Sequence, residues 1–515
     1  MKINIFNREI CACALLDTNS LCAKSSAEME GKMMKWKRIA AVGAAVMMAA
    51  GTLAGCGGGT EDVGEGGIVN LKWVTIGNGM PKNYDSWIAK VNEYIEPEIG
   101  VNLEMEVIPW GDWDKRRSIL VSTNEPFDMI FGTGNNYIAD INLGACYDIT
   151  DMIDANMPGL KELMPDKYWD GVKVKDRIYG IPSYKDSSIS NYAVWDKELV
   201  DEYNLDLASL TEIESLTEPF EILKADKNDY PVYVKNDGVS YIFDVYDQLG
   251  AGTQILGVRY DDTDGKVCFT LEEPEIYSAL ETLHEWYQKG IINPDASTLS
   301  EARVYNMWRV AQGWESAGVT AWGPQMGKEV VVQKVGDTIL SNETVRGSLN
   351  MISINTKHPE KCLQLLDMVN TDTKLRDMFY YGEEGVNFNY TEDGRVHKIN
   401  NEWAMAGYTQ GTFFTVTLED TNETNQWDEV RELNEAAVSS VMLGFTFDST
   451  EVSDKLANCR EIWLRYRSEV MTGVRDPKDT IPEIKDELMK AGWQEVMDEA
   501  QKQVDEFMEQ HGKNF

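Results

Sequence analysis

The chain has 515 residues, of which 43% are hydrophobic, 26% charged and 10% aromatic. This composition excludes a disordered tail, a collagen-like fibre and a multi-span membrane protein, and the length suffices for about three domains or two large lobes. With 48 Lys and Arg against 86 Asp and Glu, the formal net charge is −38, which makes nucleic acid a poor partner because phosphate backbones are repelled.

The N-terminal region has the pattern of a secretory signal. Three basic residues, Lys35, Lys37 and Arg38, precede the apolar run 39–53. This run suits a signal peptide and is shorter than the ~20 residues of a bilayer-spanning helix. Residues 1–32 do not fit such a signal, so Met33 or Met34 is the better start.

The apolar run ends in Leu53-Ala54-Gly55-Cys56, followed by a Gly-rich acidic stretch to Gly67. Small residues directly before a Cys resemble the lipobox of bacterial lipoproteins, in which the Cys is lipid-modified and becomes the new N-terminus. The resemblance implies that residues 1–55 are an upstream extension plus a lipoprotein signal peptide, that Cys56 carries the lipid, and that 56–67 is a flexible tether. The alternative is an ordinary signal peptide with a chance Cys.

Strand-like and helix-like patterns alternate after the tether. We expect strands at 68–73, 101–108 and 127–131, the last being almost continuously apolar, as a strand covered on both faces should be. A helix over 86–95 carries apolar residues at helical spacing. This order predicts an α/β fold with a parallel sheet.

Further elements follow in the second half of the chain. Turn signals at 262–265 and 392–394 predict hairpins, and the first lacks the full ligand ladder of a calcium loop. The patterns also predict a helix over 274–288, a buried strand over 349–354 and a helix after Pro359. The C-terminus from Thr450 is expected to be helical, with Pro482 at a helix start, and to dock onto the body.

Four cysteines remain after Cys56, namely Cys146, Cys268, Cys362 and Cys459. Outside the cytoplasm they could form two disulfides in three possible pairings. They lie far apart in apolar stretches, which favours small buried hydrophobic residues instead. None has the spacing of a zinc site, and we expect no metal and no cofactor.

Several segments in order resemble the extracellular solute-binding proteins of ABC importers, in the class of sugar- and oligosaccharide-binding lipoproteins. The resemblance covers most of 68–515, and residues 445–507 are similar to a C-terminal module of unknown function in a subset of these proteins. The segments that carry it are Phe127–Tyr137, Gly144–Asp151, Tyr179–Pro182, Val194–Leu199, Gly318–Pro324 and Arg346–Glu360.

The resemblance implies a two-lobe periplasmic-binding-protein type II fold, a Venus-flytrap whose α/β lobes close on a ligand. Mapped here, lobe 1 is 68–182 with 348–388 returning to it, and lobe 2 is 186–346. A helical C-terminal region, 389–515, is expected to pack on lobe 2. Chain crossings between the lobes then fall near Pro182–Asp186, Arg346–Gly347 and Gly385–Asn387, where Arg346 is expected to be structural.

For function, the resemblance implies a monomer anchored outside the cytoplasm, at the cell membrane, through Cys56. It would capture a carbohydrate, an oligosaccharide in particular, and deliver it to ABC permease subunits. A peptide ligand stays open.

In open α/β sheets, ligands bind beyond the carboxyl ends of the strands, and sugars need planar polar groups and aromatic faces. The loops after the strands supply Asn78, Asn135, Asn136, Tyr137, Tyr184, Lys185, Asp186, Trp322 and Gln325. Trp322 corresponds to a position where the family often places a stacking aromatic. Further candidates are Trp110, Trp113, Tyr241, Tyr381 and Glu384.

Each candidate has a structural alternative. A Trp is often a core residue, Asn135 and Asn136 are also suited to cap the next helix, and Lys185 with Asp186 also suits an interlobe ion pair. Tyr381 and Glu384 could stabilise the hinge instead of touching ligand.

Signs of enzyme chemistry are few, and no catalytic residue is assigned. The four histidines lack metal-ligand spacing, and no nucleophile elbow or phosphate-binding loop follows a strand. Two alternatives stay open: a secreted glycosidase with paired carboxylates, and a surface glycan-capture or adhesive lipoprotein without a transporter.

Overall fold

The structure is a computed structural model that describes residues 67–123, 125–301 and 303–511. The predicted signal peptide, the lipobox with Cys56 and all of the predicted tether except Gly67 lie outside these ranges. Within them, no helix combines the length and apolar character that crossing a bilayer requires.

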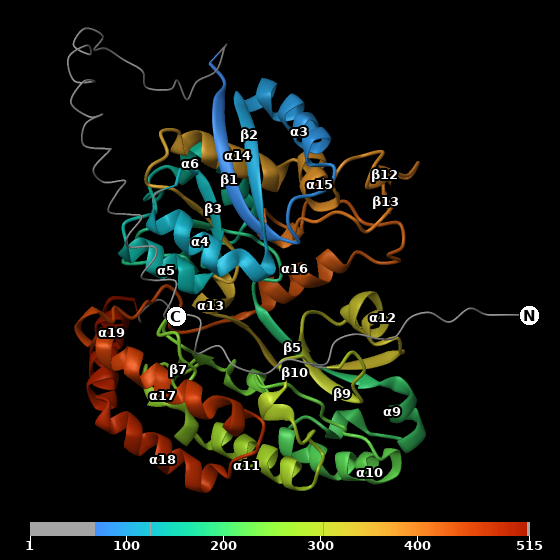
Figure 1. The fold of residues 1–515 in the computed structure, drawn as a ribbon, viewed down its shortest axis with the longest axis vertical. Helices are drawn as coiled ribbons and strands as arrows, with labels where there is room; N and C mark the ends of the chain where they lie inside the picture. Colours follow the sequence, from blue (N-terminus) through green and yellow to red (C-terminus); the bar gives the residue numbers. More distant parts are fainter. Residues whose placement is uncertain (1–66, 124, 302, 512–515) are drawn as a thin grey trace, which may run out of the picture. The chain divides into compact units, whose positions relative to one another are not determined.

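The described chain folds into two lobes (Figure 1), each with a large hydrophobic core of its own. The lobe 1 core includes Trp73 and Leu349, whereas the lobe 2 core includes Trp286 and Trp463. Each lobe therefore packs around its own buried side chains, as the resemblance implies.

The lobe 1 sheet has five strands in the order β2-β1-β3-β11-β4. Their bounds are β1 (Val69–Gly77), β2 (Val101–Pro109), β3 (Met129–Gly132), β4 (Gly180–Pro182) and β11 (Leu349–Ile352). Strand β1 is parallel to β2 and β3, whereas β11 is antiparallel to β3 and β4. Every residue of β3 and β11 is buried. The strands predicted at 68–73, 101–108, 127–131 and 349–354 are thus confirmed.

Helices cover this sheet with the apolar stripes that the sequence predicts. Helix α3 (Tyr84–Ile99) buries Trp87, Val91 and Ile95, and α14 (Pro359–Thr371) buries Cys362 among others. The remaining α-helices of this lobe are α4 (Trp113–Ser122), α5 (Gly134–Asn142), α6 (Ile153–Asn156), α7 (Pro158–Leu163), α8 (Asp166–Gly171) and α15 (Thr373–Tyr381).

Lobe 2 contains a four-stranded sheet in the order β14-β10-β5-β9 and a smaller β6-β7-β8 sheet. Their bounds are β5 (Ile189–Asp196), β9 (Trp308–Gln312), β10 (Val330–Leu340), β14 (Val438–Ser439), β6 (Tyr246–Asp247), β7 (Leu256–Arg259) and β8 (Cys268–Phe269). The predicted turn at 262–265 joins β7 to β8, and the Asp262 carboxylate accepts hydrogen bonds from the Asp264 and Lys266 amides within it. The helices include α9 (Lys197–Tyr203), α10 (Thr217–Lys227), α11 (Pro274–Gln288) and α12 (Gly323–Met326).

Three C-terminal helices, α17 (Ser453–Met471), α18 (Pro477–Lys490) and α19 (Trp493–His511), pack on lobe 2 and share its core. The Trp493 ring lies 5.9 Å from that of Phe269, measured between centroids. The predicted docking is therefore confirmed, but the predicted helix start at Pro482 is wrong. Helix α18 begins at Pro477, and Pro482 lies inside it.

The segment 389–425 packs on lobe 1, not on lobe 2 as the sequence predicts. Strands β12 (Phe388–Tyr390) and β13 (Val396–Lys398) form the predicted hairpin, and Phe388 and Val396 pack against Tyr381 of α15. Met405 belongs to the lobe 1 core and pairs with Gly77 at the end of β1. Helix α16 (Gln426–Ala436) follows this segment.

The chain crosses between the lobes at 183–188, between β4 and β5, and again after the short helix α13 (Asn342–Val345). The third crossing predicted at Gly385–Asn387 is wrong, because Asn387 there accepts a hydrogen bond from Asn83 at the start of α3 in lobe 1. The chain instead returns to lobe 2 between α16 and β14.

Arg346 follows α13 and is 2% exposed. Its guanidinium donates from Nε to the Gly171 carbonyl at 2.7 Å, from Nη2 to the Lys173 carbonyl at 2.8 Å and from Nη1 to the Thr446 hydroxyl at 2.9 Å. One side chain thus joins the crossing to lobe 1 and to the C-terminal region, which confirms its structural role.

Cys146, Cys268, Cys362 and Cys459 are free and buried. Burial raises the pKa of the Cys146 thiol to about 12 and that of Cys459 to about 11. The expected packing role is therefore confirmed for these four residues. Within the described ranges, no three His, Cys, Asp or Glu side chains gather as a metal site would require.

Candidate functional site

The carboxyl ends of β1, β2 and β3 lie at one edge of the lobe 1 sheet, since the three strands are parallel. Asn78 follows β1 directly, and Trp110 follows β2. The Trp110 indole N–H donates to Oδ1 of Asn78 at 2.9 Å. Although it is a large apolar side chain, Trp110 is 48% exposed.

One further ring lies beside this indole. The Tyr408 ring is 6.4 Å from it between centroids, at an interplanar angle of 21°, and Lys185 Nζ in turn lies 5.7 Å from the Tyr408 centroid. Lys185 is paired with Asp186 at 2.6 Å, and both residues belong to the first crossing. We call Asn78, Trp110, Lys185, Asp186 and Tyr408 the lobe 1 platform; it combines one exposed flat ring with charged and amide groups.

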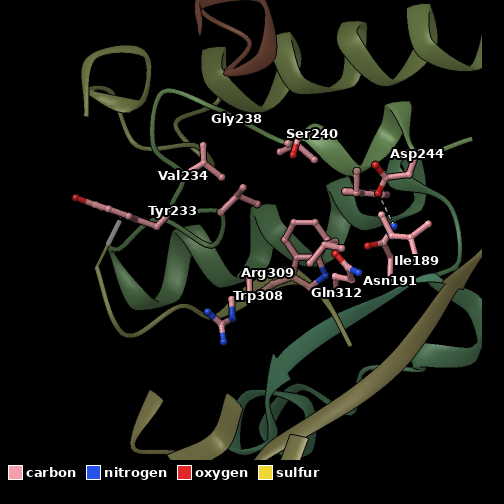
Figure 2. Close-up of a pocket in the computed structure, with 14 residues that line it drawn as sticks. Ile189, Asn191, Tyr233, Val234, Gly238, Ser240, Asp244, Trp308, Arg309 and Gln312 are labelled. Atoms are coloured by element: carbon pink, nitrogen blue, oxygen red, sulfur yellow. Dashed lines mark hydrogen bonds between the residues drawn. The ribbon is translucent and has the colours of Figure 1, made fainter. Parts of the chain in front are cut away.

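Lobe 2 contains a pocket of about 310 Å³ beside β5 and β9 (Figure 2). Its walls combine apolar side chains with hydroxyl, amide and carboxylate groups. We call this site the lobe 2 pocket, and its lining residues are Ile189, Asn191, Val232, Tyr233, Val234, Gly238, Val239, Ser240, Tyr241, Asp244, Trp308, Arg309, Val310 and Gln312.

The polar groups of the lobe 2 pocket are only partly satisfied by the protein. Asn191 Nδ2 donates to Asp244 Oδ2 at 2.8 Å, the bond drawn in Figure 2. Burial raises the pKa of the Asp244 carboxyl to about 6, although this hydrogen bond opposes the shift. The Trp308 indole N–H is buried and has no hydrogen-bond partner among the described residues.

The chain connects the platform and the pocket closely. Ile189 and Asn191 of the pocket come just after the crossing that carries Lys185 and Asp186 of the platform. Gln312 ends β9 and is paired with Asn191 of the neighbouring strand β5. Both features therefore lie where the two lobes are joined.

The loop that follows β9 in lobe 2 contacts α16, which also accepts a hydrogen bond from Tyr168 of lobe 1 at the Asn434 carbonyl. The Trp314 and Trp427 rings lie 5.7 Å apart between centroids, and the Glu429 carboxylate accepts from the Ser316 hydroxyl at 2.6 Å. It also accepts from the Glu315 amide at 2.5 Å. These contacts join the loop after β9 to Trp427 and Glu429 of α16.

The structure brings some of the predicted site residues together. Asn78, Trp110, Lys185 and Asp186 form most of the platform, and Tyr241 lines the lobe 2 pocket. Lys185 and Asp186 pair with each other within the crossing, so the alternative of an ion pair is confirmed in part.

Four predicted aromatic residues lie in the cores instead. Trp113 packs on Phe131 in lobe 1, and Tyr184 is 1% exposed. The Tyr137 hydroxyl donates to the Val172 carbonyl at 2.7 Å, and the Tyr381 hydroxyl donates to a backbone carbonyl at 2.6 Å. Their faces are covered and these hydroxyl groups donate to the chain, so they do not form part of the site described above.

The remaining predicted residues take other positions. Asn136 forms a capping box with Thr133 at the start of α5, which is the alternative role expected for it, and Asn135 is the second residue of that helix. Trp322 is 8% exposed, Gln325 accepts from Arg309 at 3.1 Å, and Glu384 lines a separate pocket beside α3.

The sequence prediction misses Tyr408 and, apart from Tyr241, every lining residue of the lobe 2 pocket; the missed residues include Asn191, Asp244 and Gln312. Asn191 and Gln312 lie on two different strands, and Asp244 and Tyr408 lie in or beside short 3-10 helices with no pattern that points to a ligand. Only the fold brings them together.

Residues 441–509 match the family described as domain of unknown function DUF3502. Over 504 residues the chain is 28% identical to a carbohydrate ABC transporter substrate-binding protein of Streptococcus pneumoniae serotype 4 (strain ATCC BAA-334 / TIGR4), covering 92% of this chain and 99% of the relative.

Solved structures show the same two-lobe fold. The N-glycan transport solute binding protein (NgtS) from Streptococcus pneumoniae has a TM-score of 0.78 and 25% identity, over 85% of this chain and 99% of that chain. An HMO binding solute-binding protein from Bifidobacterium longum infantis ATCC 15697 has a TM-score of 0.58 at 14% identity, over 85% and 99%. The chain is thus similar over most of its length to carbohydrate substrate-binding proteins of ABC transporters.

Proposed function

We propose that this protein captures an oligosaccharide between its two lobes and delivers it to an ABC permease. The observation that carries the proposal is the exposed indole of Trp110, held by Asn78 and flanked by Tyr408. A large aromatic face kept in contact with water, beside hydrogen-bonding groups, is what the apolar C–H face and the hydroxyls of a sugar require.

The magnitudes are adequate for capture. Stacking on one aromatic ring contributes about 0.5–1.5 kcal/mol beyond area burial, and each hydrogen bond adds about 0.5–1.5 kcal/mol net. A micromolar complex needs only about 8 kcal/mol. The platform and the lobe 2 pocket together offer enough rings, amides and carboxylates to reach this value.

Similar proteins support this function. NgtS has been solved in complex with Man1GlcNAc and with Man5GlcNAc, with TM-scores to this chain of 0.71 and 0.69 at 24% identity. The curated relative is a carbohydrate ABC transporter substrate-binding protein. A ligand that contacts both lobes would shift an open–closed equilibrium towards the closed form, and the closed form would dock on the permease.

Solute-binding proteins of ABC importers work outside the cytoplasm. In our proposal a lipid on Cys56 anchors this one to the cell membrane, residues 57–67 act as the tether, and the protein acts as a monomer. Mass spectrometry of the native N-terminus would detect the diacylglyceryl group; an unmodified Cys56 would remove the anchor from the proposal without touching sugar capture.

Calorimetry against a panel of glycans tests the function. We expect saturable binding of an oligosaccharide, and Trp110→Ala should weaken it about tenfold, the equivalent of ~1.4 kcal/mol. The matched control is Leu464→Ala, which removes a side chain that is 59% exposed on α17 and should leave the affinity unchanged.

The same experiment separates the alternatives. Chromatography of the glycan after incubation should return it intact, whereas cleavage would support a glycosidase. X-ray scattering should show a more compact particle with glycan bound. Binding without compaction would favour a rigid adhesive lipoprotein over an importer receptor, and no binding of any glycan would refute the proposal.

A further inference from the structure

The lobe 2 pocket contains a carboxylate with spare acceptor capacity. The bond from Asn191 occupies Oδ2 of Asp244, and no ion pair to Asp244 occurs within the described ranges. A carboxylate can accept about four hydrogen bonds through its two oxygens. Oδ1 of Asp244 is therefore available to a ligand hydroxyl.

No cation compensates this carboxylate inside the pocket. Arg309, Tyr233 and Tyr241 are the other titratable side chains of the lining. Arg309 donates from Nη2 to Gln325, and Figure 2 shows its guanidinium turned towards the end of the pocket away from Asp244. The cause that raises the pKa of Asp244 is burial, with no charged neighbour contributing.

Apolar side chains form the other walls of the pocket, and they include Val232, Val239 and Val310. Trp308 joins this lining to the lobe 2 core, since it is 3% exposed and its ring packs near those of Trp286 and Phe220. Apolar walls of this kind suit the C–H faces of a sugar ring.

Size limits what the pocket can take. Its volume of about 310 Å³ is at the lower end of the range of about 300–1,000 Å³ for small-molecule sites. It therefore has room for one sugar unit and not for a chain of several.

Building on the proposed function, we propose that the lobe 2 pocket binds one neutral sugar unit of the captured oligosaccharide, and that Asp244 excludes acidic units. Asp244 Oδ1 accepts from a sugar hydroxyl, and the apolar walls contact the C–H face of the sugar ring. A uronic or sialic acid would bring a second carboxylate close to that of Asp244, which has no cation to compensate it. Like charges close together in a partly buried site repel strongly. The net charge of −38 acts in the same direction.

The test compares a neutral oligosaccharide found in the glycan screen with its analogue oxidised at C6 of the terminal sugar, by calorimetry at about pH 8. The wild-type protein should bind the acidic analogue at least about tenfold more weakly, ~1.4 kcal/mol. Asp244→Asn should weaken binding of the neutral sugar and shrink the difference between the two sugars to about threefold or less. The control Asp498→Asn removes the same charge from an exposed position on α19. It should change neither the affinity for the neutral sugar nor the difference in affinity between the two sugars.

A second measurement separates ligand contact from folding. The melting temperature of the free Asp244→Asn variant should stay constant or rise, because the variant removes a buried charge while its amide oxygen can still accept from Asn191. A purely structural role for Asp244 would instead lower the melting temperature and leave the affinity unchanged.

The outcomes distinguish the two proposals. If the wild-type protein binds no glycan, the proposed function fails. If it binds the neutral and the acidic sugar equally, and Asp244→Asn leaves both affinities unchanged, oligosaccharide capture stands and the role of this pocket is refuted.

Discussion

Arg346 offers the sharpest test of how the crossing between the lobes is held. Replacing it with alanine removes three charge-assisted hydrogen bonds, to the carbonyls of Gly171 and Lys173 and to the hydroxyl of Thr446. Each partner is left without its donor, and an unsatisfied buried polar group costs about 1–3 kcal/mol.

The loss is partly offset because a buried cation is removed as well. Burial lowers the pKa of the Arg346 guanidinium, so its charge is held at a cost that the variant does not carry. We expect the free energy of unfolding to fall by about 3 kcal/mol for Arg346→Ala. For Arg346→Lys the free energy of unfolding should lie between those of the wild-type protein and Arg346→Ala, since an ammonium group cannot reproduce the forked geometry of the guanidinium.

Urea unfolding followed by tryptophan fluorescence measures this change through the midpoint and slope of the transition. The control is Arg465→Ala, because the Arg465 side chain is 60% exposed in its ion pair with Glu487 and such pairs contribute about 0–1 kcal/mol. A loss below about 1 kcal/mol for Arg346→Ala, no larger than a surface pair gives, would refute the reasoning.

Three further measurements follow from buried groups. Burial and the charge of Glu343 raise the pKa of Asp247 to about 8. The folded state then keeps a proton that the unfolded chain has released, so the free energy of unfolding should fall as the pH rises from about 4 towards 8 and level off above that. Asp247→Asn should flatten this decline, measured as the urea midpoint at each pH. Trp322, whose ring lies 5.9 Å from that of Tyr192, should cost about 3–5 kcal/mol of stability when replaced by alanine, and an unchanged melting temperature would contradict a core role. Iodoacetamide should leave Cys362 unmodified in the folded protein and alkylate it in urea, as mass spectrometry of peptides would show, since that thiol is buried.

The lobe 1 fold could be predicted because its local signals agree with its tertiary structure. Strand β3 is a short, continuously apolar run and is buried on both faces, and α3 buries the stripe that its spacing indicates. The segment 389–425 carries only one local signal, the turn at 392–394 that predicts its hairpin. Its position depends on single long-range contacts, such as the pairing of Met405 with Gly77, which no local signal encodes.

The site was predictable on one side for the same reason. The rule that ligands bind beyond the carboxyl ends of strands selects Asn78, and Trp110 follows the next parallel strand. Trp113, only three residues later, is the first residue of α4 and turns onto Phe131 in the core. A sequence pattern indicates the loop but does not decide which of two neighbouring indoles faces water.

The lobe 2 pocket was missed because it is assembled from segments far apart in the chain. Asn191 and Asp244 are separated by 53 positions and meet only when η4 (Ser240–Phe243) packs beside β5. Asp244 directly follows the 3-10 helix η4. From the sequence alone, an acidic residue at the end of such a short element is expected to be exposed to solvent. Burial of the carboxylate, which gives the residue its proposed selectivity, is a property of the fold alone.

The two sides of the proposed site differ in what they cost the free protein. Trp110 has its N–H satisfied by Asn78, so the platform is complete before any ligand arrives. Asp244 is a buried carboxylate that accepts a hydrogen bond from Asn191, so a hydroxyl of a ligand that donates to its other oxygen would offset part of the desolvation cost. Contact on the platform alone would leave this cost unchanged, whereas entry of one sugar unit into the lobe 2 pocket would reduce it. A ligand that reaches both is favoured over one that stacks on Trp110 alone, and this difference is what links recognition of the sugar to its contact with both lobes.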